Sequence, residues 1–396
     1  VTGTNGKTST VQLLAQAWEL LGRRAATIGT LGAAMHGDEL TLNGYTTPPV
    51  TRLHELLAGF RDRGATRVGL EVSSHALEER RAAGVEFDAV HFSNLTRDHL
   101  DYHGSMEHYA AQKAKIYDLP GKAGAAPLAI GNLDDDFVRS LLERLPAERA
   151  RVGLSSRGAA GAEIRAEGLR FAITGTTFDL IDEAPDGGRV TVTSPLIGRF
   201  NVDNLLAAVA VLRRVDRVPL ADAAAVIPSL QPPNGRMWRI RPDDSLPTVV
   251  VDAGHTPDAM RQALSAIQEY GFGRVISVFG ATGSRDAGKR PEMARAVEAR
   301  SDVVIVTDDD VHDEPGDEIV AQLLGAMADP GAPTVIRDRA AAVEHAIRLA
   351  GPEDVVMLLG KGHEPMQIVA DHVEIPYSDI ETAQNVLARV AAERRR

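Results

Sequence analysis

The sequence predicts an α/β fold in two domains, and three observations support this prediction. The 396-residue chain is 44% hydrophobic, which is enough for two cores, because single cores stop growing beyond roughly 250–300 residues. Apolar, β-rich runs alternate with segments of helical periodicity, the pattern of parallel sheets covered by helices. A Pro- and Gly-rich stretch, SLQPPNGRM at 229–237, is the expected linker. We therefore expect domains at 1–233 and 234–396.

The first domain combines a parallel sheet with a small antiparallel patch. Strands are predicted at 66–72, 89–95 and 127–133. From 163 to 194, short alternating strands are joined by Gly and Asp-Gly signals, which predicts the antiparallel patch. A helix near the start is predicted by apolar residues at helical spacing, namely Val11, Leu14, Trp18 and Leu21.

The second domain is predicted to be another α/β unit, beginning at PTVVVDAGHTPD (247–258). The apolar runs RVISVFG, DVVIVTDDD and DVVMLLGKGHE follow, and each ends in polar or Gly residues. Ligands of open α/β sheets bind at this carboxyl edge of the strands. We expect a ligand site there.

Composition excludes several classes of function. The net charge of −12 and the lack of a Lys/Arg block argue against a nucleic-acid or anionic-membrane surface. No apolar stretch approaches about 18 residues, so no membrane span is expected. The absence of cysteine excludes disulfides and thiolate chemistry. We expect a cytoplasmic, monomeric enzyme with small-molecule substrates.

The motif GTNGKT opens the first predicted helix and predicts a phosphate-binding loop. Its backbone N–H groups would hold phosphates, Lys7 would reach the β- and γ-oxygens, and the Thr8 hydroxyl would meet Mg²⁺. A Gly-rich turn with an exposed lysine is the alternative. Since a strand normally feeds such a loop, we expect the chain to begin inside a fold. The expected ATP contacts are Gly3, Thr4, Asn5, Gly6, Lys7, Thr8 and Ser9.

Nine motifs along the whole chain resemble the Mur ligases in order and spacing, and look most like the MurE branch. The resemblance implies a P-loop ATPase central domain followed by a Rossmann-like C-terminal domain, and an ATP-dependent amide-bond ligase that acts through an acyl-phosphate. The family's N-terminal domain, which binds the uridine-diphosphate end of the substrate, would precede Val1. The motifs are TGTNGKTS (2–9), TTP (46–48), EVSSHAL (71–77), FSNLTRDHLDYHG (92–104), GRFNVDNLLAA (198–208), NGRM (234–237), VDAGHTPDA (251–259), SRDAGKRP (284–291) and LGKGHE (359–364).

The resemblance implies two Mg²⁺ ions held by Thr8, Glu71, His99 and Lys113. Glu71 ends a predicted strand, where a carboxylate suits a hard cation. His99 resembles the family's histidine of the second metal site, and Lys113 its carbamylated lysine. From the residues alone, Glu71 could be a solvated strand tip, His99 a structural loop histidine and Lys113 a solvated helix lysine.

Nucleotide contacts beyond the loop are implied by the resemblance. Asn201 and Asn204 would read the adenine edge, with helix N-capping the alternative for Asn201. Arg236 would reach the ATP phosphates and Asp252 the ribose. ATP would then be held by both domains, and closure would exclude water from the acyl-phosphate.

The substrate residues include a departure from the family. Where enzymes that use meso-diaminopimelate read DNPR, this chain reads Asp309-Asp310-Val311-His312, and Ala253-Gly254 replaces a usual Tyr-Ala. A histidine cannot grip a distal carboxylate as arginine does. The acidic loop, with Asp308, Asp313 and Glu314, suits a cationic side chain, unless it is only a solvated strand end. The expected substrate residues are Thr46, Thr47, Ser73, Ser74, Arg285, Asp310, His312, Gly360 and Glu364.

The sequence therefore predicts an enzyme that adds a basic amino acid such as lysine or ornithine, rather than diaminopimelate, to the D-glutamate of a UDP-muramoyl dipeptide. Two alternatives remain open: a MurE-like paralogue that uses another carboxylate, and a nucleotide-binding partner subunit. A subunit that only binds a nucleotide needs no second metal site. The presence of Glu71, His99 and Lys113 therefore argues against this alternative.

Overall fold

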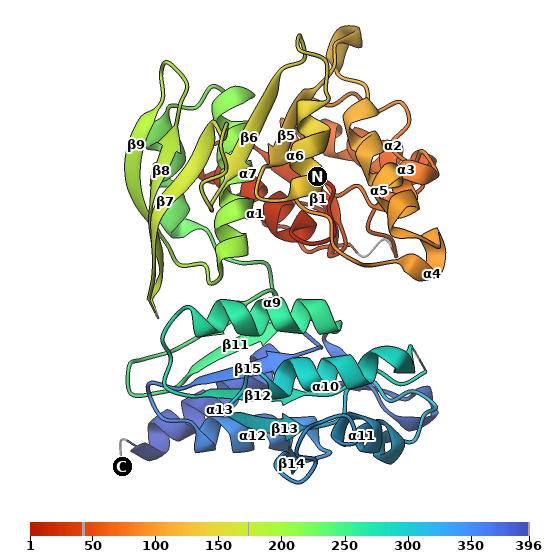
Figure 1. The fold of residues 1–396 in the computed structure, drawn as a ribbon, viewed down its shortest axis with the longest axis vertical. Coiled ribbons are helices and arrows are strands. Elements are labelled where there is room, and N and C mark those ends of the chain that lie inside the picture. Colours follow the sequence, from red (N-terminus) through yellow and green to blue (C-terminus); the bar gives the residue numbers. More distant parts are fainter. Residues whose placement is uncertain (42–43, 173, 285, 395–396) are drawn as a thin grey trace. The chain divides into compact units, whose positions relative to one another are not determined.

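The structure is a computed structural model and describes residues 1–41, 44–172, 174–284 and 286–394. It divides into two compact units (Figure 1): Val1–Arg170 with Gly175–Gln231, and Phe171–Thr174 with Pro232–Arg396. Each unit is α/β, with helices on a mainly parallel sheet, as the sequence predicts. Among the described residues, no helix has the length and apolar character needed to span a bilayer.

Val1 and Thr2 lie as an extended segment between two groups of strands in the first unit. The strands pair in the order β2-β1-β3 and β4-β5-β6-β7-β8-β9. Val1 N donates to Leu70 O of β3, and Thr2 N donates to His91 O of β4, both at 2.8 Å. Gly3 therefore leaves the sheet at the carboxyl ends of its central strands, the edge where ligands bind. The strands are β1 (Ala25–Gly29), β2 (Gly32–Met35), β3 (Arg67–Leu70), β4 (Ala89–Phe92), β5 (Leu128–Asn132), β6 (Arg151–Ser155), β7 (Ile164–Ala172), β8 (Gly175–Asp182) and β9 (Gly188–Ser194).

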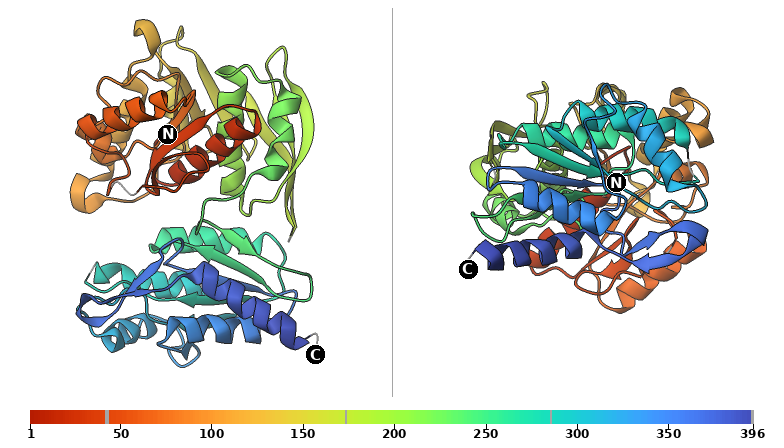
Figure 2. Two further views of the ribbon diagram at one scale, coloured as in Figure 1. Left: turned by 180° about the vertical axis from the view of Figure 1, so that it is seen from behind. Right: turned by 90° about the horizontal axis from the view of Figure 1, so that it is seen from below.

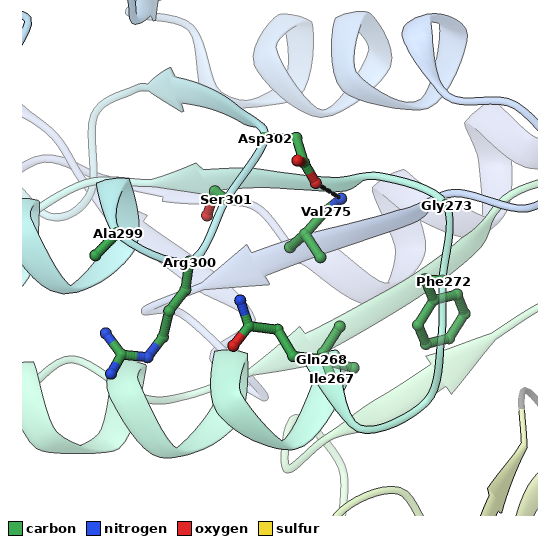
Figure 3. Close-up of a pocket in the computed structure, with 9 residues that line it drawn as sticks. All are labelled: Ile267, Gln268, Phe272, Gly273, Val275, Ala299, Arg300, Ser301 and Asp302. Atoms are coloured by element: carbon green, nitrogen blue, oxygen red, sulfur yellow. Dashed lines mark hydrogen bonds between the residues drawn. The ribbon is translucent and has the colours of Figure 1, made fainter.

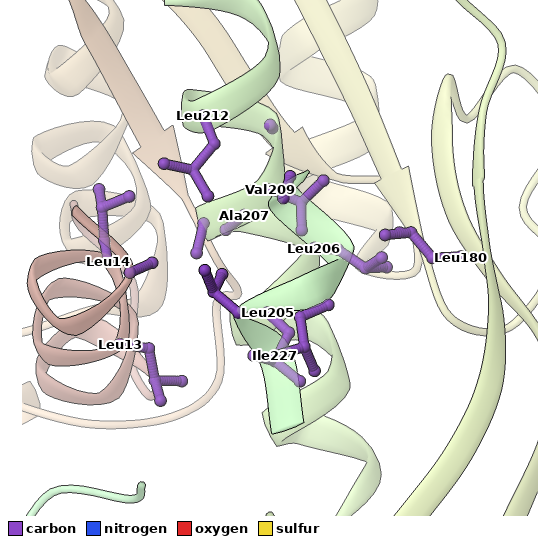
Figure 4. Close-up of a cluster of buried hydrophobic side chains, with 14 of the residues drawn as sticks. Leu13, Leu14, Leu180, Leu205, Leu206, Ala207, Val209, Leu212 and Ile227 are labelled. Atoms are coloured by element: carbon purple, nitrogen blue, oxygen red, sulfur yellow. The ribbon is translucent and has the colours of Figure 1, made fainter. Parts of the chain in front are cut away.

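Two helices pack together on one face of this sheet. Figure 4 shows Leu13 and Leu14 of α1 beside Leu205 and Ala207 of α7, all buried in one apolar cluster. Burying a leucine side chain contributes about 1.5–3 kcal/mol, so this contact fixes the helix that follows the phosphate loop. On the same helix, Trp18 Nε1 donates to Asp216 Oδ2 at 2.7 Å. The helices are α1 (Lys7–Leu20), α2 (Val50–Asp62), α3 (Ser74–Glu78), α4 (Leu100–His103), α5 (Met106–Ala114), α6 (Asp136–Glu143), α7 (Arg199–Arg214) and α8 (Leu220–Ala225).

The second unit contains a sheet of order β10-β11-β15-β12-β13-β14, antiparallel only at β10. Helices α9 and α10 lie on one face, and α12 and α13 on the other (Figures 1 and 2). Arg339 of α12 and Asp379 of α13 form a fully buried ion pair at 2.7 Å. The elements are β10 (Trp238–Ile240), β11 (Thr248–Asp252), α9 (Pro257–Gln268), β12 (Val275–Phe279), α10 (Arg290–Glu298), β13 (Val303–Val306), α11 (Gly316–Leu324), β14 (Thr334–Val335), α12 (Arg339–Leu349), β15 (Val355–Leu359), β16 (Met366–Ile368), β17 (Glu374–Pro376) and α13 (Asp379–Arg394).

The predicted strands are confirmed. The runs at 66–72, 89–95 and 127–133 form β3, β4 and β5, and the apolar runs of the second domain form β11, β12, β13 and β15. The antiparallel patch is also present: β8 pairs antiparallel with β9, while β7 joins β6 in parallel. The patch therefore extends the parallel sheet rather than forming a separate layer.

Candidate active site

The phosphate loop needs glycine at two positions. Gly3 has φ 147° and Gly6 has φ 86°, both in the region that side-chain-bearing residues avoid. A Cβ on Gly3 would lie 1.9 Å from Ser93 Oγ, and one on Gly6 would lie 2.6 Å from Asn204 Oδ1. The loop is therefore packed closely against β4 and α7, which leaves no space for larger side chains.

Ser93 and Asn94 hold the loop from the end of β4, and the sequence interpretation missed them. Asn94 Oδ1 accepts a hydrogen bond from Asn5 N at 2.9 Å, and Ser93 Oγ donates to Asn5 O at 2.6 Å. Thr4 N donates to Asn94 O at 2.9 Å. Their position directly after an apolar strand, at the edge of the sheet where ligands bind, is the sequence signal that could have identified them.

The charged and hydroxyl groups of the loop face its own backbone and Glu71. Lys7 Nζ donates to Gly3 O at 2.8 Å and to Thr4 O at 3.0 Å. Thr8 Oγ1 donates to Glu71 Oε2 at 3.0 Å. Lys7 is half-buried, and its ammonium is bound to the loop that precedes it. Ser9 is half-buried in the first turn of α1.

Glu71 is buried, with only 1% of its surface exposed. Its Oε1 accepts from Thr30 N at 3.0 Å, and its Oε2 accepts from Thr30 Oγ1 at 3.1 Å in addition to Thr8. Among the ion pairs of the described residues, none includes Glu71. The alternative of a solvated strand tip is therefore wrong. A buried carboxylate whose hydrogen bonds come from hydroxyl and backbone amide groups suits a cation.

The expected substrate residues of the first unit surround the Glu71 backbone. Thr47 Oγ1 donates to Glu71 O at 2.9 Å and accepts from Ser73 N at 3.0 Å. Ser73 also caps α3, because its hydroxyl accepts from Ala76 N. Ser74 is buried, while Thr46 lies within 3.1 Å of Thr30 through their hydroxyl oxygens. The structure thus brings these four residues to the same edge as the phosphate loop.

Lys113 is also buried, at 1% exposure, and its Nζ donates to Gly3 O at 2.7 Å. The ammonium lies 4.8 Å from the centre of the Tyr109 ring. Burial, followed by the nearby charge of Lys7, holds the pKa of Lys113 well below its ordinary value, although Asp98 opposes this shift. The alternative of a solvated helix lysine is wrong.

His99 lies in the turn before α4, in the left-handed region at φ 52°. Its side chain is 47% exposed, and Nε2 lies 3.4 Å from Asp98 Oδ2. The His99 ring centre is 6.1 Å from that of Tyr109, the same ring that Lys113 contacts. Tyr109 therefore has both expected metal ligands, His99 and Lys113, beside it.

Asn201 and Asn204 form a chain of amide contacts that ends at α1. Asn204 Nδ2 donates to Asn201 Oδ1, and Thr10 Oγ1 donates to Asn204 Oδ1, both at 3.1 Å. Asn201 Nδ2 donates to Ile197 O at 2.8 Å. The N-cap of α7 is Gly198, so the capping alternative for Asn201 is wrong. Both asparagines are buried within the first unit.

In the second unit, Asp252 ends β11 and organises the turn around the linker. Its carboxylate accepts from Met237 N and Gly254 N, each at 2.9 Å, and burial raises the pKa of Asp252. Arg236 lies in that turn and has a buried Nε without a hydrogen-bond partner among the described residues. Gly360 follows β15, and its N–H donates to Asp252 O at 3.0 Å.

The acidic loop after β13 carries its own counter-ion. Lys361 Nζ lies 2.7 Å from Asp310 Oδ1, 2.8 Å from Glu364 Oε2 and 3.9 Å from Asp309 Oδ1. Burial lowers the pKa of this lysine, but the three carboxylates outweigh burial and raise it above its ordinary value. The lysine therefore occupies the position in which an incoming cationic side chain was expected.

The remaining acidic residues of this loop are also paired. Each has a basic partner: Asp308 with Arg337 at 2.5 Å, Asp313 with His372 at 2.6 Å and Glu314 with Arg290 at 2.5 Å. His312 is half-buried, with its ring centre 5.6 Å from that of His372. Arg285, the expected contact for the α-carboxylate, lies outside the described residues.

A pocket of about 250 Å³ in the second unit is unrelated to these residues. Figure 3 shows that Gln268, Arg300 and Asp302 line it, with Asp302 bonded to the backbone of Val275. These residues lie at the amino ends of β12 and β13, opposite the carboxyl edge. None of the expected site residues lines it.

Comparisons with known proteins cover almost the whole chain. The sequence matches the Mur ligase middle domain over residues 1–212 and the "Mur ligase, glutamate ligase domain" over residues 235–362. A relative from Xylella fastidiosa (strain 9a5c), named UDP-N-acetylmuramoyl-L-alanyl-D-glutamate--2,6-diaminopimelate ligase, is 50% identical over 99% of this chain and 77% of its own length. A relative of the same name from Pseudomonas aeruginosa is 43% identical over 98% and 77%.

Solved structures agree with these matches. One, named as the structure of a UDP-N-acetylmuramoyl-L-alanyl-D-glutamate--2,6-diaminopimelate ligase, superposes with a TM-score of 0.71 at 32% identity, over 98% of this chain and 77% of that chain. Mycobacterium tuberculosis folylpolyglutamate synthase, solved with ADP and AMPPCP, has a TM-score of 0.66 at 18% identity, over 90% of this chain and 87% of that chain. This second likeness shows the fold alone.

The expected acceptor was wrong. The relatives are named for 2,6-diaminopimelate, not for lysine or ornithine, and their names do not favour the paralogue or the partner subunit. The physical reason lies in Lys361, which neutralises Asp310 and Glu364, so that the loop is not an open acidic field. The motif at 309–312 does not reveal this lysine, because Lys361 is 51 residues from Asp310 along the chain.

Proposed function

Because the chain belongs to the Mur ligase family, and is thus an ATP-dependent carbon–nitrogen ligase, we propose that it joins 2,6-diaminopimelate to the D-glutamate of UDP-N-acetylmuramoyl-L-alanyl-D-glutamate. ATP would be converted to ADP and phosphate in peptidoglycan synthesis. The observation that carries the proposal is the pair of lysines, Lys7 and Lys113, which meet at the carbonyl of Gly3 in the phosphate loop.

The first proposed step is transfer of the γ-phosphoryl group to the D-glutamate carboxylate. The protein contributes position and positive charge, because little covalent chemistry is required of it. The loop N–H groups and Lys7 would hold the phosphates. The proposed contacts to the rest of the nucleotide are Asn201, Asn204, Arg236 and Asp252.

The residues present suit Mg²⁺ at Thr8 and Glu71. Both are buried, their oxygens are 3.0 Å apart, and hydroxyl and carboxylate oxygens are the ligands that Mg²⁺ prefers. When bound, Mg²⁺ supplies charge neutralisation between the phosphate and carboxylate oxygens. His99 and Lys113 are the proposed ligands of a second ion.

Lys113 is proposed to act as a carbamate. A buried lysine beside a second cation is unfavourable as an ammonium, and its lowered pKa raises the fraction of free amine. The free amine attacks CO₂, forming one N–C bond and releasing one proton, and the product carries a negative charge. That change replaces repulsion from Lys7 with attraction.

The second proposed step forms the amide. The amine of diaminopimelate attacks the acyl-phosphate carbon, phosphate leaves, and one proton is lost from the nitrogen. The residues proposed to position the two substrates are Thr46, Thr47, Ser73, Ser74, Arg285, Asp310, His312, Gly360 and Glu364.

Phosphate release measured with ATP, Mg²⁺ and the UDP-muramoyl dipeptide tests this function. We expect kcat/KM for diaminopimelate to exceed that for lysine by about 100-fold or more, because a site that pairs the second carboxylate of diaminopimelate would keep unpaired polar groups when lysine binds. Equal rates with lysine would refute the acceptor. Turnover only with a different carboxylate donor would refute the muramoyl dipeptide but not the ligase chemistry.

A further inference from the structure

A group of metal-ligand side chains lies on three short helices and has no part in the proposed reaction. Glu78, His103 and His108 each offer one ligand atom, and these atoms all lie within 4.8 Å of one another. Glu78 ends α3, His103 ends α4, and His108 lies in the first turns of α5. His103 is buried, Glu78 is half-buried and His108 is exposed.

Two of these atoms are buried without a hydrogen-bond partner. Glu78 Oε2 and His103 Nδ1 face each other at 3.4 Å, yet neither has a hydrogen bond among the described residues. The other ring nitrogen, His103 Nε2, lies 2.9 Å from Ser74 Oγ. If Nε2 donates to Ser74, Nδ1 presents a lone pair to a carboxylate oxygen. Two facing lone pairs favour a cation between them.

His108 repeats this arrangement. Its Nε2 lies 3.0 Å from Glu78 Oε1 and 2.9 Å from Gln112 Nε2. Lys115 donates to Gln112 Oε1, which orients the amide so that its NH₂ group points to His108. The ring nitrogen then accepts from Gln112, and cannot also donate to Glu78. Both histidines therefore place an unprotonated ring nitrogen beside the Glu78 carboxylate, and a bound cation would replace Gln112 as the partner of the His108 lone pair.

We propose that Glu78, His103 and His108 form a binding site for a divalent transition metal ion of the zinc type. Zn²⁺ bonds of about 2.0–2.1 Å place tetrahedral ligand atoms about 3.3 Å apart, close to the 3.4 Å between His103 Nδ1 and Glu78 Oε2, and one ligand atom from each of the three residues lies within 4.8 Å of the others. Imidazole nitrogens select Zn²⁺ over Mg²⁺, which prefers oxygen. Ser74 supplies the oxygen that fixes the other nitrogen of a ligating histidine.

The site has a structural consequence that does not depend on the proposed function. The metal ion would cross-link α3, α4 and α5 through their ends. Two protein imidazoles and one carboxylate leave a fourth position for water, on the exposed side of His108. We expect bound Zn²⁺ to raise the thermal stability of the first unit.

Titration of the tag-free protein with Co²⁺ in saturating Mg²⁺ tests the site, because four-coordinate Co²⁺ has visible absorption bands. We expect His108→Ala to weaken this binding by about 100-fold or more, and Glu78→Gln to do the same. His108 is exposed, so its removal should leave the metal-free protein folded. The control is His345→Ala, an exposed histidine on α12, which should bind Co²⁺ as the wild type does.

A second measurement separates this site from other metal-binding positions. Zn²⁺ should raise the Tm of the wild type and of His345→Ala, but not that of His108→Ala. Equal Co²⁺ affinity in the wild type and His108→Ala would show that the metal binds elsewhere. Absence of four-coordinate bands in the wild type would leave only a hydrogen-bonded His–Glu cluster, and would overturn the proposal.

Discussion

At the scale of single residues, two lysines converge on one carbonyl oxygen. Lys7 and Lys113 both donate to Gly3 O, at 2.8 and 2.7 Å. Two ammonium groups this close repel each other, and Lys113 is too buried for water to screen the repulsion. The arrangement is favourable once Lys113 loses its charge or gains a negative one.

Replacing Lys113 by alanine should lower turnover by about 10²–10³-fold, because the charge that stabilises the transition state is lost. Affinity for ADP, measured by calorimetry, should change little, since Lys7 and the loop remain. The control is Lys115→Ala, an exposed lysine two residues away, which should keep wild-type turnover. Wild-type turnover in Lys113→Ala would exclude the carbamate.

A direct measurement of the modification is ¹³C NMR after equilibration with ¹³C-bicarbonate. The wild type and Lys115→Ala should show a carbamate carbon that Lys113→Ala lacks. A signal that persists in Lys113→Ala would place the carbamate on another amine.

Residue contacts over long sequence distances could not be predicted from the sequence. The phosphate loop was predicted, because its Gly, Lys and Thr residues are local in sequence. The partner of Gly3, Lys113, is 110 residues away, and Lys361 reaches Asp310 across 51 residues. Resemblance pointed to Lys113, but nothing local in the sequence indicated that Lys361 would neutralise the acidic loop.

At the scale of elements, strands were predicted more completely than turns. Buried parallel strands are continuous apolar runs, which the sequence shows directly. The turn at Gly235, by contrast, depends on what it touches. Gly235 has φ 68°, and a Cβ there would lie 2.1 Å from His363 N and 2.3 Å from the Gly362 carbonyl carbon. The linker turn thus rests on the loop after β15.

Gly235→Ala should destabilise the second unit much more than Gly271→Ala. Gly271 has the same φ of 68° with nothing within 4 Å of a Cβ, so it isolates the backbone cost of about 1–2 kcal/mol. In Gly235→Ala the new Cβ also overlaps backbone atoms, which should lower the stability by about 1–3 kcal/mol more. Urea unfolding followed by circular dichroism measures both. Equal losses of stability would show that the turn can shift away from His363.

At the scale of the whole molecule, the chain is two units with separate cores. In the second unit, α13 is joined to α12 by Arg339 and Asp379, both fully buried. Arg339 also donates to Leu359 O at the end of β15, at 3.0 Å. This ion pair therefore connects the last helix to the edge that carries Gly360 and Lys361.

Arg339→Met should lower the stability of the second unit by about 3–5 kcal/mol, because Asp379 would keep a buried, uncompensated charge. The first unit should be unaffected. The control is Arg348→Met on the same helix, whose pairs with Glu344 and Glu393 are exposed and contribute about 1 kcal/mol or less. Scanning calorimetry should show one of two transitions moving down in temperature in Arg339→Met alone. A shift of both transitions would mean that the two units unfold together.

The position of the two tryptophans gives the molecule a natural optical probe in each unit. The sequence contains only Trp18 and Trp238, and they lie on α1 of the first unit and β10 of the second. Trp18 is 4% exposed, so its fluorescence should shift to longer wavelength when the first unit unfolds and its indole meets water. The emission spectrum of Trp238→Phe would therefore report only the first unit, which carries the phosphate loop. The spectrum of Trp18→Phe would report only the second unit.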